Sequence, residues 1–163
     1  MEHANEFFNE YLTNLSKGVF VARIGKVVKF YPEVMKVEVM PMPTDKNALV
    51  INVPMVTVRT GDFLIYYPPK PGDTVILLFL DGDADEILLG RDNAQTERVH
   101  DVSDCVCLGG ITLLNEKLDV DDKKALNIQN MTNTAKIVVK KDGDIDIKCK
   151  HFKVEAERID LNP

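Results

Sequence analysis

The stretch Pro68–Leu89, PPKPGDTVILLFLDGDADEILL, decides the fold of this 163-residue chain. Its prolines favour an extended approach, and Gly72-Asp73 predicts a turn. Thr74–Leu80 is an apolar and β-branched run of strand length, which predicts a buried strand. Asp81–Asp85 predicts a second turn and Glu86–Leu89 a returning strand. We therefore expect a β-hairpin at the centre of an all-β domain.

Alternating apolar and polar residues extend the β pattern on the N-terminal side. Val19–Met42 predicts two strands around Tyr31-Pro32-Glu33. Ala48–Val58 predicts a third strand, in which Pro54 indicates a bulge or an edge. About five strands are expected before Gly90, which fits a five-stranded barrel such as the OB-fold better than a sandwich. Helical crossovers are missing from the pattern, which argues against a parallel sheet.

Residues 5–17 carry the helical pattern of this chain, with Asn5 as a plausible N-cap and Gly18 as a plausible stop. The apolar residues of this segment fall on one helix face. That face either packs across one end of its own barrel or docks on a neighbouring protein, and we interpret it as a docking face for such a partner. The face consists of Phe7, Phe8, Tyr11, Leu12 and Leu15.

Beyond Gly110 the pattern changes to short apolar pairs separated by polar segments, an irregular repeat. Each pair is too narrow to form a core within one chain. Three copies wound about a common axis would turn the pairs inward, as in a triple-stranded β-helix, whereas the alternative is an ordinary β-meander. The predicted trimer core comprises Ile111, Leu113, Leu118, Val120, Leu126, Ile128, Ile137, Val139, Ile145, Ile147, Val154, Ala156, Ile159 and Leu161.

The composition excludes several classes of protein. With 45% hydrophobic and 28% charged residues, the chain is neither disordered nor membrane-embedded. The opening residues lack a signal-peptide pattern, so we expect synthesis in a reducing cytoplasm, where the three cysteines need no disulfide. The formal net charge of −6 argues against nucleic acid as a partner, because such binding depends on clustered Lys and Arg.

Motifs that could carry chemistry are weak. Asp81, Asp83 and Asp85 resemble the start of a calcium loop but lack its later glycine and glutamate, so a solvated hairpin tip is the better interpretation. Cys105 and Cys107 share one strand face and are interpreted as core residues. The histidines show no ligand spacing, and the Ser103 region shows no nucleophile motif. We expect no catalytic residue, no metal and no cofactor.

Three aromatic residues cluster after the third strand. Phe63, Tyr66 and Tyr67 could stack bases or sugars, but the acidic balance favours their interpretation as core and interface residues. An OB-fold binding module for an oligonucleotide or oligosaccharide is therefore the alternative function, with a small hydrolase as a third.

The chain resembles the short central-spike, or membrane-puncturing, proteins of contractile phage tails and phage-tail-like bacteriocins, of the gpV type. The resemblance is carried by GKVVKFYPEVMKVEVMP, by KPGDTVILLF and by the RVHDVSD loop with the apolar strand after it. It implies a homotrimer with an OB-fold collar under the baseplate hub and a β-helical spike that points at the host envelope.

The resemblance leads to a structural function rather than an enzymatic one. We expect a trimeric central tail-spike in the baseplate at the tail tip of a virion or particle, which presses on or pierces the bacterial envelope during contraction. Several members end in an iron-binding His-x-His motif that this chain lacks, so a separate tip-cap protein becomes more attractive. The expected division is a helix at 1–17, an OB-fold-like domain at 18–109 and a spike domain at 110–163.

Overall fold

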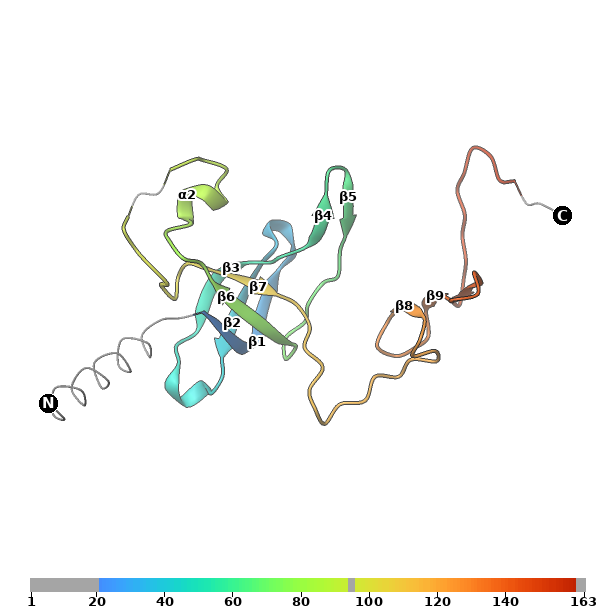
Figure 1. The fold of residues 1–163 in the computed structure, drawn as a ribbon, viewed down its shortest axis with the longest axis horizontal. Coiled ribbons are helices and arrows are strands. Elements are labelled where there is room, and N and C mark those ends of the chain that lie inside the picture. Colours follow the sequence, from blue (N-terminus) through green and yellow to red (C-terminus); the bar gives the residue numbers. More distant parts are fainter. Residues whose placement is uncertain (1–20, 94–95, 161–163) are drawn as a thin grey trace, which may run out of the picture. The chain divides into compact units, whose positions relative to one another are not determined.

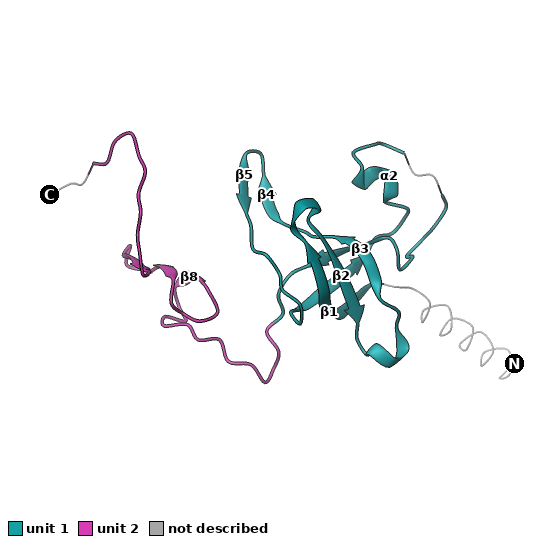
Figure 2. Cartoon of the chain, turned by 180° about the vertical axis from the view of Figure 1, so that it is seen from behind, with its two compact units in different colours: residues 1–111 teal, residues 112–163 magenta. Residues whose placement is uncertain are grey.

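The computed structural model describes residues 21–93 and 96–160, and the chain divides into two compact units, residues 1–111 and 112–163 (Figure 2). The predicted helix at residues 5–17 lies outside the described residues, as does Leu161. Within those described ranges, no helix is long and apolar enough to cross a membrane. The division into a collar domain and a spike domain stays a prediction.

The first unit is built on a curled five-stranded sheet with the order β3-β2-β1-β6-β7, in which all neighbours are antiparallel (Figure 1). Strand β1 carries a bulge between Val27 and Lys29, where the register against β2 shifts. The strands are β1 (Ala22–Tyr31), β2 (Lys36–Pro41), β3 (Val50–Pro54), β6 (Thr74–Phe79) and β7 (Cys105–Leu108). Two short 3-10 turns, η1 (Pro32–Val34) and η2 (Thr44–Lys46), lead into β2 and β3.

The core of this sheet follows from strict alternation along the strands. In β2 and β6 every second side chain is buried, because successive residues of a strand point to opposite faces. Small β-branched residues dominate, and they fit a tightly curled sheet. The buried cluster comprises Val27, Val37, Val39, Val50, Val53, Val75, Leu77, Phe79, Cys105 and Cys107.

The two edge strands of the curled sheet meet at one point. Met55, just after β3, forms a parallel bridge with Cys107 of β7, and the Val56 N–H donates to the Cys107 carbonyl at 2.8 Å. Strands β1, β2 and β3 form a meander, and β6 and β7 form an antiparallel pair. Together with the parallel contact at Met55, they make a partly open five-stranded barrel. The all-β, OB-like prediction is confirmed for this unit.

One strand prediction is wrong. Residues Asp85–Leu88 form a short helix, α2, rather than a strand paired with β6. The Asp83 carboxylate accepts the Asp85 N–H at 3.1 Å, and the Leu88 N–H donates to the Ala84 carbonyl, so a helical turn closes instead. The strand that pairs with β6 on this side is β7, so the fifth barrel strand comes after Gly90 rather than before it.

A separate hairpin of β4 (Val58–Thr60) and β5 (Phe63–Ile65) lies outside the five-stranded sheet. Figure 1 shows it projecting from the barrel. Its residues are exposed, Phe63 by 80%. Tyr66 and Tyr67, just after the hairpin, are exposed as well, so these three aromatic residues are not core residues, which corrects that part of their interpretation.

The chain enters and leaves the barrel at opposite ends. The Phe79 N–H at the end of β6 donates to the Val21 carbonyl, next to the start of β1. The Ile111 N–H donates to the Thr74 carbonyl at the beginning of β6. Since β6 spans the barrel, Val21 lies at one end of it and Ile111, the last residue of this unit, at the other.

The second unit contains one three-stranded antiparallel sheet, of order β10-β9-β8. Its strands are β8 (Leu126–Gln129), β9 (Lys136–Val139) and β10 (Ile145–Lys148). The turn before β9 is held by Asn130, whose side-chain oxygen accepts the N–H groups of Thr134 and Ala135. Gly143 supplies the left-handed conformation, at φ 98°, that the turn before β10 requires. The triple-stranded β-helix stays a prediction.

Candidate functional site

The sheet of the second unit presents an apolar face made of two rows of three side chains. In the register of the strands, Leu126 lies beside Val139 and Val139 beside Ile145, while the next row repeats the arrangement. All six side chains are open to solvent, by 37 to 62%. The apolar face comprises Leu126, Ile128, Ile137, Val139, Ile145 and Ile147.

The opposite face of the same sheet is polar and covered by the chain itself. Lys136 is buried there and forms an ion pair with Asp121. The Asn127 amide donates to the Asp122 carbonyl at 2.7 Å, and the Gln129 amide donates to the Asp119 carbonyl at 2.6 Å. The segment before β8 therefore covers part of this face, although the side-chain oxygens of Asn127 and Gln129 are buried there without a hydrogen-bond partner. The apolar face has no cover within the described part of this unit.

The other predicted trimer-core residues do not join a sheet. Ile111, Leu113 and Val120 are half-buried. Leu118, Val154, Ala156 and Ile159 are exposed in segments without strands. The structure thus brings together six of the predicted residues, which share a face because the alternation within each strand is in register with its neighbour.

A second constellation, which sequence reasoning missed, surrounds Arg98 in the first unit. Its guanidinium donates to Asp104 from Nε at 2.9 Å, to Asp83 at 2.9 Å and to Asp85 at 2.8 Å. The side chains of Asp83 and Asp104 are buried, while Asp85 is mostly exposed. We call these four residues the Arg98 network. The one sequence signal was the lone arginine of the RVHDVSD loop.

The Arg98 network corrects the interpretation of the aspartate-rich turn. Asp83 is 5% exposed and is not part of a solvated tip, although Asp81 and Asp85 are open to solvent. Asp83 also accepts hydrogen bonds from the hydroxyl of Thr96 at 2.8 Å and from its N–H at 2.9 Å. These bonds lower the pKa of Asp83, and that of Arg98 is raised, chiefly by its hydrogen bond to Asp104.

Carboxylate oxygens of Asp83, Asp85 and Asp104 lie within 4.8 Å of one another, a spacing that suits a cation. The positive charge between them is supplied by the Arg98 guanidinium. The network therefore joins the α2 segment to the start of β7 across a long loop. We interpret it as a structural clamp, in which Arg98 holds the α2 segment against the start of β7.

The cysteines and the Ser103 region fit local structural roles. Cys105 and Cys107 are buried in the barrel core, as predicted, and burial raises the pKa of both thiols to about 11. Cys149 is exposed. Asp101 accepts hydrogen bonds from the Ser103 N–H and hydroxyl, which closes a turn and lowers the Asp101 pKa.

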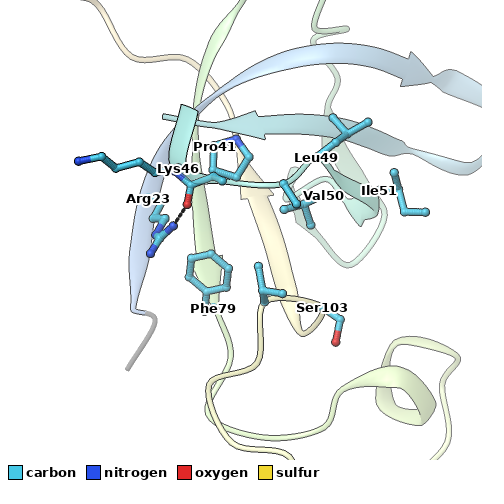
Figure 3. Close-up of a pocket in the computed structure, with 11 residues that line it drawn as sticks. Arg23, Pro41, Lys46, Leu49, Val50, Ile51, Phe79 and Ser103 are labelled. Carbon is cyan, nitrogen blue, oxygen red and sulfur yellow. Dashed lines mark hydrogen bonds between the residues drawn. The ribbon is translucent and has the colours of Figure 1, made fainter. Parts of the chain in front are cut away.

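A pocket lies at the end of the barrel where the chain enters (Figure 3). It has a volume of about 390 Å³ and a mostly apolar lining, which comes from β1, β6, the end of β2, the start of β3 and the loops before β3 and β7. Figure 3 shows Arg23 and Lys46 on one side and Leu49, Val50 and Ile51 on the other, with Phe79 between them.

The chain is a small OB-like barrel followed by a strand-rich extension, and one face of the sheet in this extension is apolar and exposed to solvent. The chain belongs to the family described as phage protein Gp138 N-terminal domain, whose model matches residues 24–110. The match covers the barrel unit and confirms the phage part of the sequence resemblance, consistent with a tail or baseplate protein. No curated protein matches the chain.

Proposed function

We propose that this protein is a trimeric structural spike of a phage or phage-tail-like baseplate, which presses on or pierces the bacterial envelope when the tail contracts. The observation that carries the proposal is the apolar face of the second unit. A sheet that has one face covered by its own chain and leaves six large apolar side chains of the other face in solvent calls for a partner.

Other copies of the same chain are the partner that this face fits best. Each row of the face is flat and three residues wide, and both edge strands, β8 and β10, have one unpaired side among the described elements. Three copies around an axis would cover the apolar faces and shorten the exposed edges at once. The polar turns at residues 130–135 and 140–144 would then face water.

The topology of the first unit supports an orientation for the spike. Since the chain enters and leaves the barrel at opposite ends of β6, a barrel attached by its entry end would have the second unit continue from its free end. We propose that residues 1–110 face a trimeric hub of the tail and that the last residues lie farthest from it. The terminal apolar residues would be covered there by a separate cap protein.

The oligomeric state tests the proposal. Native mass measurement and sedimentation of the full chain at micromolar concentration should give a homotrimer, whereas a stable, folded monomer would contradict the spike. In assembled particles, a label fused after Pro163 should appear by electron microscopy at the distal tip. Label density at the hub would mean that the proposed orientation is wrong. A tip with no additional protein density would mean that there is no cap protein.

A second candidate, an OB-fold binding module, is favoured by one observation. The β4–β5 hairpin and the residues after it hold exposed aromatic side chains, including Phe63 and Tyr66. Such side chains can stack on bases or sugars. Titration with a single-stranded oligonucleotide and with an oligosaccharide panel tests it, and the Phe63→Ala variant should lose any binding that depends on the hairpin.

A further inference from the structure

The pocket at the entry end of the barrel is large enough for more than one bulky side chain. A cavity of about 150 Å³ accommodates a benzene molecule, and this one measures about 390 Å³. Its lining includes Leu49, Ile51 and Val102, which are exposed by 38 to 58%. Concave apolar surfaces of this kind are sites where another group packs.

The chain itself arrives at the rim of this pocket. The Val21 carbonyl accepts the N–H of Phe79, a lining residue, and Arg23, two residues further on, is also part of the lining. Twenty residues precede Val21, so this segment joins the barrel beside the pocket. Residues 18–20 can span at most about 11 Å when extended, so residues 5–17 are tethered close to it.

Residues 5–17 carry apolar side chains that could fill the pocket. At helical spacing, Phe7, Phe8, Tyr11, Leu12 and Leu15 form one apolar stripe with three aromatic rings. Charge also matches, since the first 17 residues hold Glu2, Glu6 and Glu10 against Lys17, while the rim carries Arg23 and Lys46.

We propose that residues 5–17 of the chain pack their apolar stripe into the entry-end pocket of the same chain's barrel, in place of the docking on another protein that the sequence pattern suggested. The short tether makes this contact intramolecular, with the high effective concentration that a short linker provides. The segment then belongs to the collar itself and covers the end of the barrel at which the chain enters. This inference does not depend on the spike function, because it concerns one barrel and its own leading segment.

Hydrogen exchange of the full chain tests the contact. Leu12→Asp places a charge on the stripe, whereas Thr13→Asp places the same charge on the opposite helix face and serves as the matched control. With Leu12→Asp, amides of residues 49–51 and 102–103 should exchange about tenfold faster or more than in the parent. The control should leave them unchanged. Equal exchange in all three proteins would overturn the proposal.

A cysteine pair identifies which copy supplies the segment. In a Cys149→Ser background, Leu12→Cys combined with Leu49→Cys should cross-link within one chain when treated with a short bifunctional maleimide, with Thr13→Cys and Leu49→Cys as the control pair. A product of single-chain mass supports the proposal. Products joining two chains would assign the segment to a neighbouring copy, and failure to cross-link faster than the control would leave the pocket to a hub protein or a small apolar ligand. Either result would refute the intramolecular contact, and neither would contradict the proposed trimer.

Discussion

Ile137 lies directly opposite Ile147 across β9 and β10, and Ile128 lies opposite Ile137 on the other side, so three isoleucines form one row of side chains. All three are at least 40% exposed within a single chain. Ile137 occupies the centre of the row, because β9 is the middle strand of the sheet. A partner that covers the row must therefore cover Ile137.

Replacing Ile137 with Asp should prevent assembly. In a trimer the substitution would place three carboxylates in an apolar interface, where an unpaired charge is very costly. Lys141→Asp, in the exposed turn before β10, introduces the same side chain away from the apolar face and is the control. We expect the Ile137→Asp protein to sediment as a monomer and the control as a trimer. A trimer formed by both would mean that the apolar row does not face the other copies.

The Arg98 network offers a paired test of buried and exposed carboxylates. Asp104 and Asp85 both accept hydrogen bonds from Arg98, but the Asp104 side chain is 1% exposed and that of Asp85 is 68% exposed. Asp104→Asn should lower the thermal midpoint of unfolding by about 5 °C or more, because the guanidinium loses a desolvated partner. Asp85→Asn should change it little, since exposed ion pairs contribute little. Equal shifts in the two variants would contradict a structural clamp.

The strands of the barrel could be predicted because their pattern is local. Thr74–Phe79 forms β6 almost as the apolar run indicates, and the turn at Gly72 forms as expected, with the Asp73 carboxylate accepting the Lys70 N–H. The six residues of the apolar face were also recognisable. In β8 and β10 apolar and polar residues alternate, and that alternation alone assigns a residue to a face. In β9 three apolar residues follow one another, and only the register with its two neighbours shows that Ile137 and Val139 share the apolar face.

The segment between β6 and β7 could not be predicted, because its structure depends on contacts between residues distant in sequence. Glu86–Leu89 has the composition of a short strand, yet Asp83 and Ala84 are held by Thr96, Arg98 and Asp104. These contacts place a helical turn where a strand was expected. The burial of Asp83 could not be predicted either, because an aspartate-rich turn is ordinarily exposed to solvent.

Acid should destabilise the first unit through Asp83. Its hydrogen bonds, chiefly from the Thr96 hydroxyl and then from the Asp85 N–H, hold its pKa below the ordinary value of 3.8. A carboxyl whose folded pKa is depressed stabilises the fold above its unfolded pKa, and that contribution is lost as the pH falls through the folded pKa. The thermal midpoint should therefore decline below about pH 4. Asp83→Asn should start lower at pH 7 and decline less, whereas Asp62→Asn, at the hairpin tip, should follow the parent.

Leu77 should be the most sensitive position of β6. Its side chain is fully buried in the barrel core, and its neighbour Leu78 points to the other face of the strand with 36% exposure. Leu77→Ala removes the same atoms as Leu78→Ala but leaves a cavity, at a cost of about 2–5 kcal/mol. Chemical denaturation should give a clearly lower unfolding free energy for Leu77→Ala than for Leu78→Ala. Equal losses would mean that the barrel interior is not packed around β6.

The barrel cysteines should resist alkylation until the protein unfolds. Burial raises the pKa of Cys105 and Cys107 to about 11, so at pH 7.5 fewer than about one thiol in a thousand is ionised, and the thiolate is the reactive form. Cys149→Ser removes the exposed cysteine and leaves these two as the only thiols. Mass spectrometry of this variant after brief maleimide treatment should show no adduct in native buffer and two in denaturant. Rapid native labelling of either thiol would mean that the edge between β3 and β7 opens, since Cys107 contributes the Met55 bridge that joins those strands.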